Sequence, residues 1–196
     1  MKRLSSCIAD FYIKRNIIKP NDREVYEYGL SLIINDAVTF LLIFAISAIF
    51  DEVRFAAEFL LTFCVSRVFC GGYHAKKEWI CRCLMIGIYL GVSTLSAVIA
   101  PFGAVPAAVI AAVSLVVLFI LIPVRHPNKT LDEAEVKKNR RKGIITLVLF
   151  DFLSLCLSVS GNRDGFIIAL SLFAVAALAV IGTLLYGGGE FHEKDC

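Results

Sequence analysis

The chain has 196 residues, of which 58% are hydrophobic, and its formal net charge is +3 at pH 7. A soluble globular domain is usually about 45–50% apolar, so this composition argues against a soluble protein. The apolar residues fall in runs of about 17–22 residues, the length that crosses the hydrocarbon core of a bilayer. The sequence therefore predicts an all-α fold, a polytopic bundle of transmembrane helices that forms one integral-membrane domain over residues 1–196.

The first twenty residues have the pattern of a surface helix. Over residues 4–18 the apolar side chains recur at helical spacing, and the basic side chains lie off that face. This pattern is typical of an amphipathic helix in the membrane interface, with a solvated tail as the alternative. Pro20 is expected to end this interfacial helix, so its predicted bounds are 1–20. Asn21 and Glu24 then have the spacing of a capping box, with Asn21 as the cap of the next helix.

Six membrane spans are predicted after this helix. Their approximate bounds are 30–50, 54–70, 83–100, 104–124, 144–160 and 165–186. The second and fifth are short, and a four-span protein with two re-entrant or interfacial segments is the alternative. Polar residues inside a span are costly and indicate either function or pairing. We expect pairing, with one another or with Arg67, for Asn35, Asp36, Glu58 and Asp151.

The distribution of Lys and Arg predicts the orientation. Connections on one side carry 6, 4, 7 and 1 of these residues, and those on the other side carry 1, 0 and 1. The positive-inside rule then places both termini and the connection around residues 66–83 in the cytoplasm of a multi-pass cell-membrane protein. The basic loop 125–143 contains a run expected to bind anionic lipid headgroups or an acidic substrate tail, with plain solvation as the alternative. This basic cluster consists of Lys137, Lys138, Arg140, Arg141 and Lys142.

Residues 66–83 carry the chemistry, because they contain a histidine and three cysteines in an otherwise apolar chain. A neutral imidazole can take the proton of a thiol, and the thiolate is the nucleophile. If a helix begins near Lys77, the positive end of its dipole favours a thiolate at Cys81. On one unbroken helix His74 and Cys81 would be about 10.5 Å apart along the axis, too far for a hydrogen bond. Gly71 and Gly72 are expected to break the helix, so that His74 lies on a loop above Cys81.

Positive charge around this pair comes from Arg67, Lys76, Lys77 and Arg82.

Three alternative interpretations use the same segment. On an unbroken helix Cys70 and His74 would be neighbours at i and i+4. Cys70, His74, Cys81 and Cys83 could together form a C-x3-H-x6-C-x-C metal site. The cysteines could also simply pack as small apolar side chains.

The motif Arg67…Gly71-Gly72-Tyr73-His74-Ala75…Cys81 resembles the signature of the accessory gene regulator B (AgrB) family. These are membrane cysteine endopeptidases that process quorum-sensing propeptides in Gram-positive bacteria. The resemblance implies that His74 is the catalytic histidine, that Cys81 is the nucleophile and that Arg67, Gly71 and Gly72 support them. It extends to Tyr28-Gly29-Leu30 and to the segment 123–129, whereas Ser31 departs from the long polar residue that members often carry there.

The resemblance also implies a reaction. The enzyme would cleave the acidic C-terminal tail from an AgrD-like propeptide through a thioester acyl-enzyme, and an internal thiol or hydroxyl would close a thiolactone or lactone ring. No metal and no cofactor is needed for this chemistry. The expected partners are the propeptide and membrane lipids, with Lys76, Lys77 and the basic cluster as binding candidates; a homodimer is a further expectation, and nucleic acid is not. The competing interpretations are a non-enzymatic membrane metal carrier that uses the four-residue Cys/His cluster, and a scaffold without chemistry.

Overall fold

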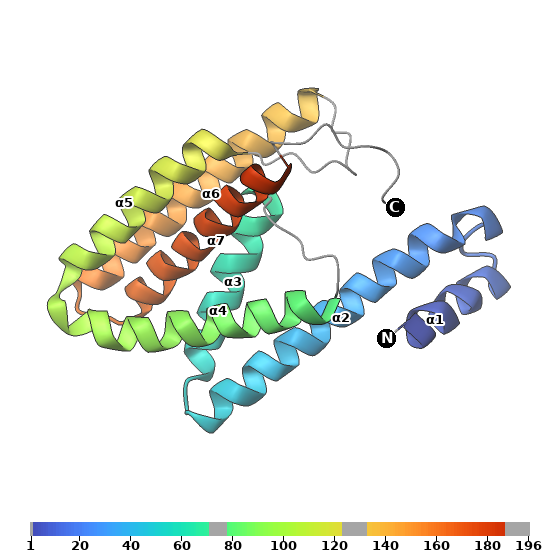
Figure 1. Cartoon of the computed structure of the whole chain (residues 1–196), viewed down its shortest axis with the longest axis horizontal. Coiled ribbons are helices and arrows are strands. Elements are labelled where there is room, and N and C mark those ends of the chain that lie inside the picture. The colour runs from blue at the N-terminus through green and yellow to red at the C-terminus, as the bar shows by residue number, and fades with distance from the viewer. Residues whose placement is uncertain (1, 71–77, 123–132, 187–196) are drawn as a thin grey trace. The chain divides into compact units, whose positions relative to one another are not determined.

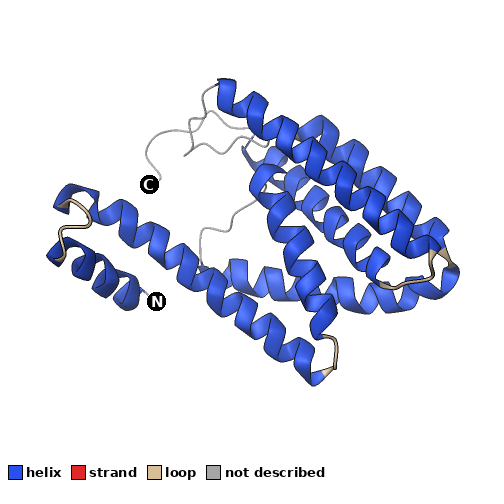
Figure 2. Ribbon diagram, turned by 180° about the vertical axis from the view of Figure 1, so that it is seen from behind, coloured by secondary structure: helices blue, strands red, loops and turns tan. Residues whose placement is uncertain are grey.

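A computed structural model describes residues 2–70, 78–122 and 133–186 of the chain. These residues form seven α-helices and two short 3-10 helices, and they contain no strand (Figure 2). In chain order the elements are α1 (Lys2–Lys14), η1 (Pro20–Asp22), α2 (Arg23–Ile49), α3 (Val53–Cys70), α4 (Glu78–Ile99), η2 (Ala100–Phe102), α5 (Ala104–Leu121), α6 (Glu133–Val159) and α7 (Asp164–Tyr186). The all-α polytopic bundle predicted from composition is confirmed.

Within the described ranges, five segments are long and apolar enough to cross a membrane. They are Pro20–Ile49, Trp79–Phe102, Ala104–Leu121, Lys137–Val159 and Asp164–Leu185. The predicted span 54–70 does form a helix, α3, but it is not among the five because its 18 residues include Arg54, Glu58 and Arg67. The predicted short span 144–160 is instead the apolar part of the 27-residue helix α6.

The N-terminal helix is shorter than predicted. α1 ends at Lys14, and Asn16 follows in the left-handed region with a φ of 55°. Asparagine is one of the few residues that adopt this conformation readily. The helix therefore stops before Ile18, although the apolar pattern of the predicted helix continues to that residue. Pro20 therefore opens η1 and does not end α1. The predicted cap is also wrong, because Asp22 and not Asn21 precedes α2, and it makes no side-chain capping bond.

The chain divides into two compact units. The first contains residues 1–51 and 75–87, and the second contains residues 52–74 and 88–196. In the first unit α1 packs against α2, and Arg23 joins them. Its Nε lies 2.9 Å from Asp10 Oδ1, its Nη2 donates to Ser6 Oγ at 2.7 Å, and its Nη1 pairs with Glu27 Oε2 at 2.7 Å. Leu4 and Phe11 stay exposed on α1, which leaves it an apolar face.

In the second unit α7 is the central helix. It packs against α3, α5 and α6, and Figure 1 shows it among these three helices. The contact with α6 is close at the start of α7: Ser154 Oγ donates to the carbonyl oxygen of Gly165 at 2.7 Å. A side chain at Gly165 would collide with Ser158, so this position needs glycine.

A polar cluster that we call the Arg163 network holds one end of the second unit. Arg163 Nη1 pairs with Glu52 Oε1 at 2.6 Å, its Nη2 donates to the Ser93 carbonyl at 2.6 Å, and its Nε donates to Ser96 Oγ at 2.9 Å. Its guanidinium also lies 4.3 Å from the ring centre of Phe55. One side chain thus connects the α2–α3 connection, the start of α3, the second half of α4 and the α6–α7 connection.

A second arginine lies in the same part of the unit. Arg54 forms an ion pair with Asp164, the first residue of α7, and its Nε lies 3.0 Å from Glu58 Oε1. Arg54 and Arg163 are the two arginines that the sequence places in connections on the extracytoplasmic side, and both are paired with carboxylates. The sequence predicted that Glu58 pairs with another polar residue inside a span or with Arg67, and this is wrong because its partner is Arg54.

Candidate functional site

The described residues include only part of the predicted catalytic segment 66–83. Residues 66–70 form the last turn of α3, and residues 78–83 form the beginning of α4. His74, Gly71, Gly72, Lys76 and Lys77 lie outside the described residues, so the pairing of His74 with Cys81 stays a prediction. The residues before Glu78 lie outside the described residues, so the predicted helix start near Lys77 also stays a prediction; Cys81 is the fourth described residue of α4.

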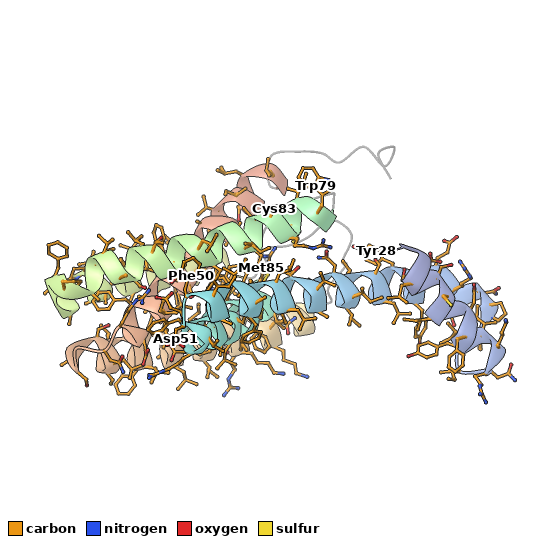
Figure 3. All side chains as sticks on the ribbon, turned by 90° about the horizontal axis from the view of Figure 1, so that it is seen from below. Tyr28, Phe50, Asp51, Trp79, Cys83 and Met85 are labelled. Carbon is orange, nitrogen blue, oxygen red and sulfur yellow. The ribbon has the colours of Figure 1, made fainter. Side chains whose placement is uncertain are left out.

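Cys81 is partly exposed on α4. Met85, one turn further on, is 8% exposed and lies between α4 and α2 in Figure 3. Cys83 is exposed on the side of α4 away from α2, as is Trp79 (Figure 3). Because Cys81 and Cys83 are two residues apart on a helix, their spacing places them on different sides of it.

Arg82, the residue after Cys81, forms a hydrogen bond with a side chain of α2. Arg82 Nη2 donates to Asn35 Oδ1 at 2.7 Å, and Asn35 is only 4% exposed. The sequence predicted that Asn35 pairs with another intramembrane polar residue or with Arg67, and this is wrong because Arg82 is its partner. No periodicity links positions 47 residues apart, so the sequence held no signal for this bond.

The other predicted supporting residues lie at the end of α3. Arg67 is in the last turn, and its guanidinium carbon lies 5.6 Å from the ring centre of Phe63. Cys70, the last residue of the helix, is completely buried, as expected for a cysteine that packs as a small apolar residue. Asp151 is also buried in the second unit, and its Oδ1 has no hydrogen-bond partner within the described part of the chain.

The described residues contain no group of three His, Cys, Asp or Glu side chains that could hold a metal ion. The predicted cluster of Cys70, His74, Cys81 and Cys83 includes a residue outside that range. It therefore stays a prediction, weakened only by the different directions of Cys81 and Cys83.

The basic cluster belongs to a helix and not to a loop. α6 begins at Glu133, so the second half of the predicted loop 125–143 is helical, and residues 123–132 lie outside the described residues. All five side chains of the basic cluster are exposed. Two of them also contact aromatic rings: Arg140 Cζ lies 5.9 Å from the ring centre of Phe119, and Lys142 Nζ lies 5.9 Å from that of Phe69. Lys137, Lys138 and Arg141 are thus the members most suited to meet an external anion.

Comparison with known families gave one result that covers almost the entire chain. The model of a family described as "AgrB: Accessory gene regulator B" matches residues 5–185. The match includes both units and the whole segment 66–83. Searches of curated proteins and of solved structures each found no match.

Proposed function

This chain belongs to the accessory gene regulator B family, whose members process the propeptides of agr quorum sensing, and we propose on that basis that it is a membrane cysteine endopeptidase. The observation that carries the proposal is the family match over residues 5–185, because it includes the motif from Arg67 to Cys81. The position of Cys81 supports it, because the thiol is partly exposed near the beginning of the described part of α4.

In the proposed reaction His74 takes the proton from the Cys81 thiol, and the thiolate attacks a backbone carbonyl of the propeptide. The tetrahedral oxyanion is stabilised by backbone N–H groups, for which the start of α4 and the Gly71-Gly72 segment are the candidates. Collapse forms a thioester with Cys81 and breaks the peptide bond, and His74 returns its proton to the departing amine of the tail. The internal thiol or hydroxyl of the propeptide then attacks the thioester, closes the ring and releases Cys81.

We place this site on the cytoplasmic side of the membrane. The count of Lys and Arg in the connections supports that orientation.

The proposed substrate is an AgrD-like propeptide with an amphipathic leader and an acidic tail. The leader would hold it at the membrane surface, where its local concentration near Cys81 is high. The basic cluster, Lys76 and Lys77 would together attract the acidic tail and anionic lipids. Association with a second copy of the chain is compatible with this reaction but is not needed for it.

The test is co-expression with the propeptide and detection of the released tail. Cys81→Ala and His74→Ala should each abolish release, and the Cys81 adduct should be seen in the wild type as a hydroxylamine-sensitive mass increase. Cys83→Ala is the matched control, because Cys83 is two residues away and faces away from α2. Loss of activity in Cys70→Ala with full activity in Cys81→Ala would show that the nucleophile is wrongly assigned.

A further inference from the structure

We propose that Asn35 is a positioning residue, which fixes the first turns of α4, and with them the sulfur of Cys81, through its hydrogen bond to Arg82. This inference rests on the proposed function, because it assigns a role to Asn35 in the reaction of Cys81. All the contacts that carry it lie within the first unit.

Asn35 differs from its polar neighbours on the same face of α2. Ser31 and Thr39 lie one turn before and one turn after it, and both are buried. Ser31 Oγ donates to the Tyr28 carbonyl at 2.9 Å, and Thr39 Oγ1 donates to the Asn35 carbonyl at 2.7 Å, so each satisfies its own helix. The Asn35 side chain instead accepts a bond from another helix. A polar side chain inside an apolar span is costly, and here it has a specific partner.

Side chains, not close backbone packing, join α4 to α2. The pair is not among the described helix pairs that approach closely along their backbones, as α1 and α2 do. Met85 fills the space between α2 and α4 with an unbranched, flexible chain, which specifies position poorly. The Arg82–Asn35 bond is directional and charge-assisted, and such bonds are shorter and stronger than neutral ones. It is therefore suited to set the rotation and height of α4 relative to α2.

The rotation of α4 determines where the nucleophile points. Cys81 and Arg82 are consecutive, so fixing the guanidinium fixes the direction of the sulfur about 100° around the helix. If α4 rotated by one residue position, the sulfur of Cys81 would point to a different side of the helix. Attack on a carbonyl requires a separation of about 3–3.5 Å, and a displacement of about 1 Å can cost about 100-fold in rate. Asn35 should thus act on the chemical step more than on substrate affinity.

The experiment compares Asn35→Leu, which keeps the size but removes the acceptor, with Asn35→Asp, which keeps an oxygen in place. Thr39→Val is the matched control, because it removes only a bond within α2. Single-turnover acylation is measured at rising propeptide concentrations. We expect Asn35→Leu to slow the saturated rate about tenfold with half-saturation unchanged within about twofold, and Asn35→Asp to restore the rate to within about twofold of wild type. Thr39→Val should match the wild type.

A second measurement keeps the inference independent of the peptidase. The alkylation rates of Cys81 and Cys83 by iodoacetamide are measured in the same molecule by peptide mass spectrometry. Asn35→Leu should change their ratio at least about threefold, and Arg82→Met should change it in the same direction. The double variant should equal Arg82→Met, because Asn35→Leu then has no bond left to remove. Equal effects of Leu and Asp, additive effects of the two sites, or an unchanged ratio would overturn the inference. An unchanged alkylation ratio would overturn the inference whether or not an acyl-enzyme forms. The absence of an acyl-enzyme in the wild type would instead refute the proposed function.

Discussion

The Arg163 network predicts a specific loss of stability when Glu52 becomes glutamine. The change keeps the size of the side chain but removes the charge that faces Arg163 Nη1 at 2.6 Å. Hydrogen bonds to charged groups contribute about 1.5–3 kcal/mol each. The side chains of Arg163 and Glu52 are 22% and 25% exposed, so solvent weakens their pairing in part. We therefore expect Glu52→Gln to lower the free energy of unfolding by about 1–2 kcal/mol.

The matched control is Glu58→Gln, the same chemical change in a different environment. Glu58 pairs with Arg54 within one helix, and the Arg54 side chain is 67% exposed. Such exposed i,i+4 pairs contribute about 0.3–0.5 kcal/mol, so this variant should stay close to the wild type. The measurement is the unfolding equilibrium of the purified protein in mixed detergent micelles at rising fractions of SDS. Equal destabilisation by the two variants would refute the role given to the Arg163 network.

The same residue gives a pH dependence. Glu52 lies in the connection between α2 and α3, where burial alone would raise its pKa, but the hydrogen bonds from Arg163 and Ser93 outweigh burial and lower the pKa. A carboxyl with a lowered pKa in the folded state binds fewer protons than in the unfolded state. Its stabilisation is therefore complete above the unfolded pKa of about 4.3 and is lost as the pH falls through the folded pKa. The difference between wild type and Glu52→Gln should be constant from pH 7 to about pH 5 and shrink below about pH 4. A difference that grows on acidification would contradict the assigned sign.

Three further predictions concern topology, metal and substrate. Reporters fused after residues 101 and 162 should read outside and those after 130 and 190 inside, because the basic connections stay in the cytoplasm; an inside reading at 162 together with an inside tail would favour the four-span alternative. Chelators should leave activity intact and the protein should purify without stoichiometric zinc, whereas zinc that is lost on Cys83→Ala would favour the metal interpretation. Changing the basic cluster to glutamine should raise the propeptide concentration needed for half-saturation, most strongly at low salt, without slowing acylation at saturation. A slower rate at saturation would show that the cluster acts in the chemistry or the fold. Most of the effect should come from Lys137, Lys138 and Arg141, because Arg140 and Lys142 also contact aromatic rings.

What the sequence predicts well is whatever depends on neighbouring residues. The long apolar runs predict membrane-length helices, and five such segments are found among the described residues. Local choices between similar conformations are harder: the left-handed Asn16 ends α1 early, although the apolar pattern continues to Ile18. The span 54–70 was predicted from its length, and its three charges separate α3 from the five apolar segments.

The polar contacts between helices could not be predicted, because they join positions far apart in the chain. Glu52 and Arg163 lie in two different connections and Ser93 lies in α4, and nothing in their local sequences marks them as partners. The same applies to Asn35 and Arg82. The motif around Cys81 could be identified, since its residues are close in sequence, but the residues that hold it could only come from the fold.

The Arg163 network and the Arg82–Asn35 bond have different roles in the proposed peptidase. The Arg163 network lies in the second unit, at the connections predicted outside, where four elements are tied together by one guanidinium. The Arg82–Asn35 bond lies in the first unit, beside the proposed nucleophile, and joins two helices that have little close backbone contact among the described residues. The Arg163 network resists opening, because several charged bonds must break together. Under the proposed function, the first turns of α4 adjust when a propeptide binds, while the bond to Asn35 sets their rotation; the second half of the same helix is held by Arg163 at Ser93 and Ser96. Glu52→Gln should therefore reduce the amount of folded protein without changing the acylation rate per folded molecule. Asn35→Leu should slow acylation per folded molecule without reducing the amount of folded protein.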